Sequence, residues 1–105
     1  MDIKNIYDNT IKGKEFEVIE ELFSTKSFRL ERIKSFGHIT PVNQWYNQET
    51  DEWVLLLRGQ AKLLFKNNNK TVSLNSGDYL LIHKGTVHRV DFTSKDALWL
   101  CIHFK

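Results

Sequence analysis

Residues 77–92 read GDYLLIHKGTVHRVDF, two short apolar segments separated by glycine-containing turns. Gly77 precedes the run Tyr79–His83, and Gly85 precedes the run His88–Phe92. Glycine adopts the positive φ that a tight chain reversal needs, so the glycines predict turns and the apolar runs predict strands. The same alternation extends outward from this stretch in both directions.

Short runs of β-branched, leucine and aromatic residues recur from residue 27 to the end of the chain, each closed by Gly, Asn, Ser or Pro. Their spacing of about ten residues favours an all-β sandwich or barrel. Asn67-Asn68-Asn69 predicts a tight hairpin, because asparagine tolerates positive φ. The predicted strands are Ser27–Phe36, Asp51–Arg58, Ala61–Lys66, Lys70–Leu74, Tyr79–His83, His88–Phe92 and Ala97–Phe104.

The N-terminal part of the chain has a different pattern. Within Gly13–Phe23, apolar residues recur at spacings of three and four, which predicts a short helix and leaves a strand as the alternative. The 105 residues suffice for one domain. We therefore expect residues 1–26 to form an extension that packs on a barrel formed by residues 27–105.

Composition excludes several classes of protein. The formal net charge is +2 and forms no basic stripe, so we expect no nucleic-acid partner. Apolar runs such as Trp53–Leu57 are far shorter than the roughly 20 residues that span a bilayer, so we expect no membrane partner. The lone Cys101 cannot form an intrachain disulfide, and no signal-peptide pattern is present, so we expect a cytoplasmic protein.

Two predicted strands are apolar on both faces. Trp53–Leu57 and Tyr79–Ile82 do not alternate, whereas an antiparallel strand with one wet face should. A cover on the outer face is therefore needed, and we expect a homodimer with Trp53 at the subunit interface. Trp99 is likewise expected on a covered outer surface, and Cys101 is expected to be a small core residue.

Glu52 and His88 form the most promising chemical pair. Glu52 stands seven residues before Gly59, and His88 stands eleven residues after Gly77. Side chains at even separations share a strand face, so both residues are expected to enter one interior. A carboxylate beside an imidazole can act as a general acid or base, and both residues are predicted to be catalytic.

At these residues the sequence resembles the cupin superfamily, over roughly Gly37 to Phe92. The second cupin motif is glycine, five residues, proline, one residue, glycine, two residues, histidine, three residues and asparagine. This chain matches the two glycines and the histidine with Gly77, Gly85 and His88, and it has His83 and Phe92 at the proline and asparagine positions.

The first cupin motif, which pairs two histidines with a glutamate and a glycine, is incomplete. Glu52 keeps its six-residue gap to Gly59, but the two histidine positions hold Tyr46 and Gln48. In the longer permitted register they hold Trp45 and Asn47. No register recovers a pair of histidines.

The resemblance implies a double-stranded β-helix, or jelly-roll barrel, with one open mouth. It also implies a metal site at which Tyr46, Gln48, Glu52 and His88 would hold iron, manganese, nickel or zinc. Because two of the usual imidazoles are missing, the alternative is that no metal binds. Amide and phenol groups are weaker ligands for these ions. The residues predicted to line a ligand pocket are Trp45, Tyr46, Gln48 and His103.

Three functions stay open at this point. The chain resembles small bacterial single-domain cupins, in which Glu52 and His88 would act on a small molecule by acid–base or weak metal-assisted chemistry. Alternatively, the same pocket binds a sugar-like ligand without chemistry, or the domain is a homodimeric interaction protein with a vestigial site. The fold alone does not choose among them, because cupins host many functions.

Overall fold

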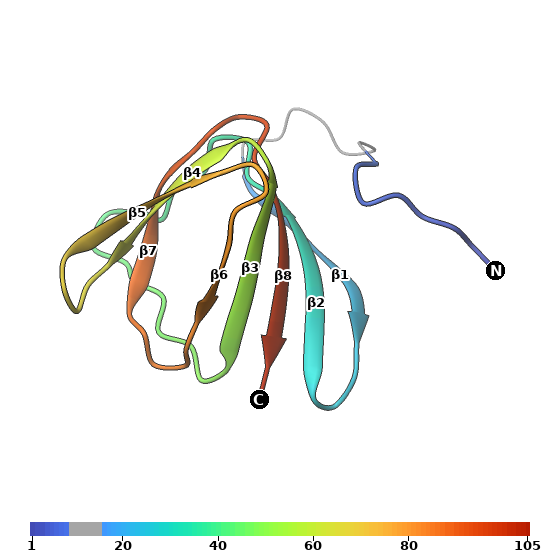
Figure 1. Ribbon diagram of the computed structural model, residues 1–105, viewed down its shortest axis with the longest axis horizontal. Coiled ribbons are helices and arrows are strands. Elements are labelled where there is room, and N and C mark those ends of the chain that lie inside the picture. The colour runs from blue at the N-terminus through green and yellow to red at the C-terminus, as the bar shows by residue number, and fades with distance from the viewer. Residues whose placement is uncertain (9–15) are drawn as a thin grey trace.

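The computed structural model describes residues 1–8 and 16–105, which form eight strands in two antiparallel sheets and are shown in Figure 1. The larger sheet has the order β1-β2-β8-β3-β6 and the smaller one β5-β4-β7. No helix capable of crossing a membrane occurs among the described residues. The strands are β1 (Val18–Ser24), β2 (Phe28–Lys34), β3 (Asp51–Arg58), β4 (Gln60–Phe65), β5 (Lys70–Asn75), β6 (Tyr79–Ile82), β7 (His88–Thr93) and β8 (Leu98–Phe104).

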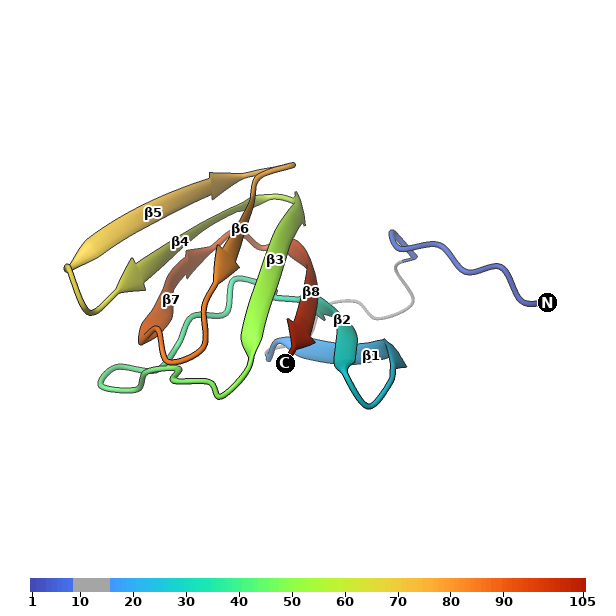
Figure 2. The ribbon, with the colours of Figure 1, turned by 60° about the horizontal axis from the view of Figure 1, so that its bottom comes forward.

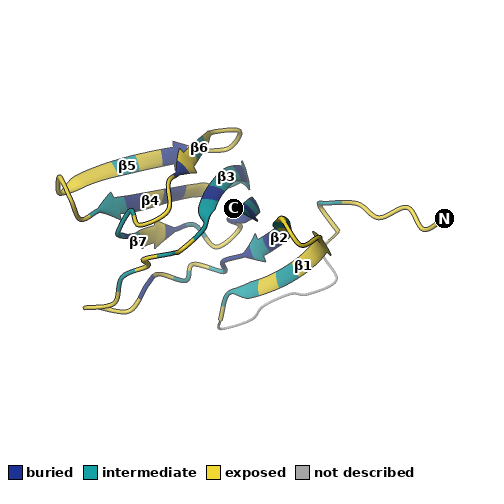
Figure 3. Ribbon diagram, turned by 90° about the horizontal axis from the view of Figure 1, so that it is seen from below, coloured by how far each residue is buried: buried dark blue, intermediate teal, exposed yellow. Residues whose placement is uncertain are grey.

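The all-β prediction is confirmed, and each of the seven strands expected after residue 27 overlaps one of β2 to β8. The two sheets face each other, as Figure 2 shows, and Figure 3 shows buried residues on strands of both sheets. Val54 and Leu56 of β3 and Leu63 of β4 lie in the core, each at most 4% exposed. Burial of these alternate residues fixes the register, because a one-residue slip would expose them.

The helix predicted over Gly13–Phe23 is wrong where the structure describes it. Residues 13–15 lie outside the described residues, and Val18–Ser24 forms the edge strand β1, paired with β2 from Val18↔Lys34 to Ser24↔Arg29. A helix of about two turns has little stability of its own, so pairing with an available strand edge prevails. The alternative of a strand is therefore confirmed.

Positive φ angles occur at the predicted turns. Asn69 has φ 53° in the hairpin between β4 and β5, which confirms the asparagine turn. Gly59 has φ 90° between β3 and β4, and Gly77 has φ 92° before β6. These conformations favour glycine, because a Cβ atom would be strained there.

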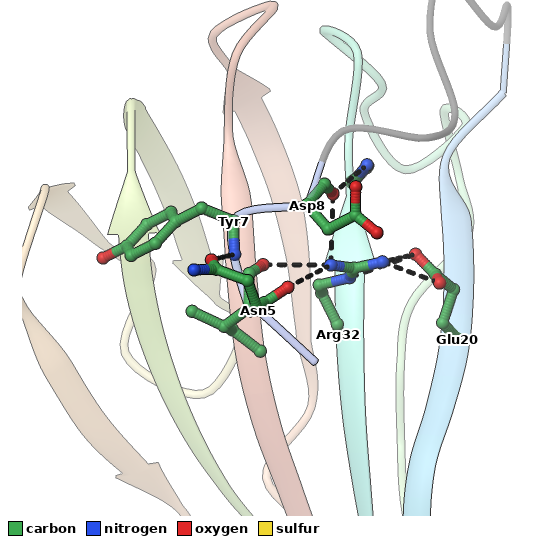
Figure 4. Close-up of polar contacts among 7 residues, drawn as sticks. Asn5, Tyr7, Asp8, Glu20 and Arg32 are labelled. Carbon is green, nitrogen blue, oxygen red and sulfur yellow. Dashed lines mark hydrogen bonds and ion pairs between the residues drawn. The ribbon is translucent and has the colours of Figure 1, made fainter. Parts of the chain in front are cut away.

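The N-terminal segment is attached to the outer face of the larger sheet, the face turned away from the smaller sheet. Arg32 is 5% exposed and forms an ion pair with Glu20, 2.7 Å from Nη2 to Oε1 (Figure 4). Its Nη1 donates to the carbonyl oxygens of Ile6 at 3.0 Å and Asp8 at 3.2 Å. A buried guanidinium needs such acceptors, so Arg32 holds residues 6–8 against β2.

Two tryptophans lie on opposite faces of the larger sheet. Trp53 lies on the outer face, where its ring centroid is 5.5 Å from that of Tyr79. The expectation of an outer position for Trp99 is wrong: Trp99 pairs with Leu56 and Ile33, is 6% exposed, and its Nε1 donates to Ser35 Oγ at 2.9 Å. An indole N–H is normally buried only with a partner, and Ser35 supplies it.

Candidate functional site

A cavity of about 230 Å³ lies between the two sheets. Five of the six residues predicted for the site line it, namely Tyr46, Gln48, Glu52, His88 and His103. Trp45 does not line it, because its ring is covered by the Arg89 guanidinium at 4.7 Å and the Lys66 ammonium at 5.2 Å. Five of the predicted site residues therefore meet in this cavity, whereas Trp45 takes part in cation–π contacts outside it.

Strand register brings Glu52 and His88 to the same interior. Glu52 is an inward residue of β3, opposite His103 of β8 and Ile82 of β6. His88 begins β7 in the other sheet, where its backbone pairs with that of Tyr46. His88 Nε2 and Glu52 Oε1 are 4.0 Å apart, and the residues are 4% and 8% exposed. At this distance they form no hydrogen bond, so each is free to bond to a ligand.

A backbone contact fixes the tautomer of His88. Its Nδ1 lies 2.8 Å from the carbonyl oxygen of Thr86, which can only accept a hydrogen bond, so Nδ1 carries a proton. In the neutral ring, Nε2 is then an unprotonated acceptor. This is the nitrogen that lies nearer Glu52 and the cavity. His88 is thus arranged to accept a proton from a ligand.

His103 joins two carboxylates, and one of them was missed by the sequence analysis. Its Nε2 is 3.0 Å from Glu31 Oε1 and 3.6 Å from Glu52 Oε2. Glu31 also accepts from Arg29 Nε at 2.8 Å. Both Arg29 and Glu31 line the cavity from β2. Their inward positions are fixed by pairing with His103 and Cys101, which no local motif indicates.

Burial raises the pKa of Glu52, because the charged form loses its hydration. The His103 and His88 imidazoles oppose this effect, Glu31 adds to it, and a hydrogen bond from the Cys101 thiol opposes it. Cys101 is 2% exposed, which confirms its expected place in the core, and burial raises the pKa of its thiol well above the ordinary value. Burial therefore makes Glu52 a weaker acid than a carboxyl group in water, and it makes Cys101 unreactive.

The wall formed by Tyr46 and Gln48 is polar but incompletely bonded. Burial raises the pKa of the Tyr46 phenol, and a hydrogen bond with Thr40 opposes that rise. Among the described residues, Gln48 Oε1 is buried without a hydrogen-bond partner. A buried amide oxygen without a partner is costly, so this atom marks a place where a donor can bind.

Glu17 was also missed, and it brings a third carboxylate to the cavity from the residue before β1. Burial raises its pKa, and the nearby His38 opposes that rise. The predicted extension therefore contributes to the site. The pairing of β1 with β2 positions Glu17, and the sequence offered a strand there only as the alternative to a helix.

The arrangement does not supply a set of metal ligands. Within residues 1–8 and 16–105, no group of three or more His, Cys, Asp or Glu side chains is placed to hold a metal ion. Glu31 occupies His103 Nε2, which leaves Glu52 and His88 with the weaker donors Tyr46 and Gln48. This donor set is a weak one for a transition-metal ion, and the chemical steps of the proposed function use no metal.

The comparisons with known proteins agree with this fold. The family profile described as "Cupin domain" matches residues 37–103. A structure from Ralstonia eutropha JMP134, titled "putative mannose-6-phosphate isomerase", is 27% identical, covers 100% of this chain and 99% of its own, and has a TM-score of 0.93. A search of curated proteins gave no match. The chain belongs to the cupin family.

More distant structures show the same fold. An RmlC-like cupin from Desulfovibrio desulfuricans is 18% identical, with a TM-score of 0.76 over 99% of this chain and 96% of its own. A cupin superfamily protein from Desulfitobacterium hafniense DCB-2 is 16% identical, with a TM-score of 0.75 over 90% and 83%. The predicted double-stranded β-helix is therefore confirmed.

Proposed function

We propose that the cavity binds a small molecule and transfers a proton within it, with His88 as the base and Glu52 as the acid. The observation that carries this proposal is the placement of His88 Nε2 and Glu52 Oε1, 4.0 Å apart and both beside the cavity. In the neutral ring His88 offers Nε2 as an acceptor, and burial raises the pKa of Glu52. These two features suit a base and an acid, respectively.

The reaction best suited to this pair is enolisation of a carbonyl compound. His88 Nε2 takes a proton from the carbon next to the carbonyl, while the Glu52 carboxyl gives its proton to the carbonyl oxygen. The product is an enol beside an imidazolium and a carboxylate, and the reverse transfers restore the carbonyl. Net isomerisation follows when the proton returns to a different carbon.

The similarity to the Ralstonia structure supports an isomerisation of this kind, because that protein is described as a "putative mannose-6-phosphate isomerase". That description also specifies a phosphorylated sugar, which the charge of this cavity does not favour. Apart from Glu52, the proposed acid, the carboxylates of Glu17 and Glu31 outnumber the single guanidinium of Arg29 among the described lining residues. We therefore extend the reaction type to this chain and not the phosphate.

A second candidate is a binding module without chemistry, which the unpaired Gln48 Oε1 and the Tyr46 ring favour as ligand contacts. Hydrogen–deuterium exchange separates the two functions. Small α-hydroxy and α-amino carbonyl compounds are incubated with the protein in D₂O, and loss of the C–H signal is followed by NMR. Exchange above the buffer rate supports proton transfer, whereas ligand binding without exchange supports the binding module.

Matched variants assign the exchange to the pair. Glu52→Gln and His88→Gln are each expected to slow the exchange by about 100-fold or more. His83→Gln is the control, because its imidazole is 74% exposed and lies outside the cavity lining. Exchange that is unchanged in both site variants would overturn the assignment of acid and base.

A further inference from the structure

The lining of the cavity carries more negative than positive groups. Glu17 and Glu31 line it as carboxylates in addition to Glu52, the proposed acid, and Arg29 is the sole Lys or Arg side chain that lines it among the described residues. Arg29 forms an ion pair with Glu31, so the positive charge of Arg29 is already partly balanced. The described residues show no ion pair for Glu17. A ligand that brings a positive charge would balance this surplus.

The hydrogen-bonding groups of the cavity also favour a ligand that donates hydrogen bonds. Among the described residues, Gln48 Oε1 is buried without a hydrogen-bond partner, and His88 Nε2 is an acceptor in the neutral ring. Two donors of the lining are already used, because Trp99 Nε1 donates to Ser35 Oγ and Arg29 Nε donates to Glu31. The unbonded Gln48 Oε1 therefore requires a donor from the ligand.

We propose that the ligand of this cavity carries a primary ammonium group, which donates to Gln48 Oε1 while Glu17 supplies the opposite charge. This inference deepens the proposed function, and rests on it in assigning the ammonium compound as the substrate. An ammonium has three donors and no acceptor, so it matches a wall of unused acceptors. A carboxylate or phosphate would meet the charge of Glu17 and has no proton to donate to Gln48 Oε1, so an anion is a poorer match.

Three compounds of one size test the preference: propylamine, 1-propanol and propionate. Each is titrated into ¹⁵N-labelled protein at pH 7, and amide shifts of the cavity residues are followed by NMR. Propylamine is expected to bind in the millimolar range, about tenfold more tightly than 1-propanol, with propionate weakest. Equal or tighter binding of propionate or 1-propanol, or no binding of propylamine, would overturn the proposal.

Variants locate the ammonium. Gln48→Leu is expected to weaken propylamine binding about tenfold, and Gln48→Glu to strengthen it. Gln44→Leu is the matched control, because Gln44 is exposed and does not line the cavity. Glu17→Gln is expected to weaken binding, whereas Glu49→Gln removes an exposed charge and should not. Unchanged affinity in Gln48→Leu and Glu17→Gln would overturn the assignment of these two residues.

The two proposals fail independently. Binding of propylamine is read from amide shifts and needs no chemistry, whereas proton transfer is read from loss of a C–H signal in D₂O. Ammonium preference without exchange would remove the proposed function and leave the ligand class. Hydrogen–deuterium exchange on neutral compounds, with no preference for propylamine, would remove the ligand class and leave the proposed function.

Discussion

Glu31 Oε1 lies 3.0 Å from His103 Nε2, at the centre of the buried polar cluster. The same nitrogen is 3.6 Å from Glu52 Oε2, which exceeds the length of a hydrogen bond. A single N–H therefore serves Glu31, and Glu52 is left with the Cys101 thiol and the cavity. This division allows Glu52 to hold a proton of its own.

The charge of Glu31 contributes to that state, because it raises the pKa of Glu52. Glu31→Gln removes the charge and keeps an oxygen that can accept from His103. We expect the pKa of Glu52 to fall in this variant, as measured by carboxyl ¹³C NMR titration. Glu21→Gln, at an exposed position of β1, is the control. A Glu52 pKa that does not change would contradict the contribution of the Glu31 charge.

Glu52 should also affect stability in a pH-dependent way. Its pKa is raised above the ordinary value of 4.5, so the folded protein binds this proton more tightly than the unfolded chain. The contribution is fully present below the ordinary pKa and is lost as pH rises through the raised one. Glu52→Gln should therefore unfold at higher urea than wild type at pH 7, by about 1 kcal/mol, with a smaller gain at pH 4. A loss of stability at pH 7 would contradict this account.

Metal content offers a separate check on the site. The described residues place no group of three His, Cys, Asp or Glu ligands around one point, so we expect metal well below one equivalent in protein purified without added metal. Elemental analysis gives the measurement, with Glu52→Gln and His88→Ala beside wild type. One equivalent of iron, manganese, nickel or zinc that both variants lose would establish a metal centre and require His103 to leave Glu31.

The sequence predicted the Glu52 and His88 pair because both residues belong to strands with recognisable turns and motif spacing. Arg29 and Glu31 were not predictable in the same way. In β2, charged side chains occupy both faces, since Arg29 and Glu31 point inward while Arg32 points outward to Glu20. Hydrophobic alternation therefore gives no orientation for this strand, and only pairing with β8 decides it.

The inward position of Trp99 was also not predictable, because its strand is apolar and not charged on both faces. Its strand, β8, is apolar on both faces, with Leu98, Trp99, Leu100 and Cys101 in succession. Alternation then shows which residues share a face, and the shared face of Trp99, Cys101 and His103 was indeed predicted. It does not show which face is inward, because that depends on the opposite sheet.

The glycine at position 59 is required for a steric reason. A Cβ atom there would collide with Ser94 Oγ and lie 2.9 Å from Ala97 Cα, in addition to the strain of φ 90°. Gly77 has φ 92°, but no atom of the described residues lies within 4 Å of such a Cβ. We expect Gly59→Ala to lower the free energy of unfolding by at least about 3 kcal/mol, and Gly77→Ala by about 1–2 kcal/mol, in urea titrations. Equal losses would show that only backbone strain matters.

The outer face of the larger sheet motivates the expected homodimer. Tyr79 is 66% exposed and Leu81 45% exposed, beside the half-buried Trp53 on the neighbouring strand. Contiguous apolar surface of this kind is typical of a contact between subunits, and we propose that a second copy covers it. Light scattering during size-exclusion chromatography should then give about twice the chain mass of 12.4 kDa.

A substitution at this face tests the dimer directly. Leu81→Lys places a charge in the proposed contact and should yield a folded species of 12.4 kDa at tens of micromolar, because an unpaired charge is costly to bury. Phe92→Lys is the matched control, since Phe92 is 41% exposed but belongs to the smaller sheet. A wild-type mass of one chain would refute the dimer, and dissociation by Phe92→Lys instead would move the contact to the smaller sheet.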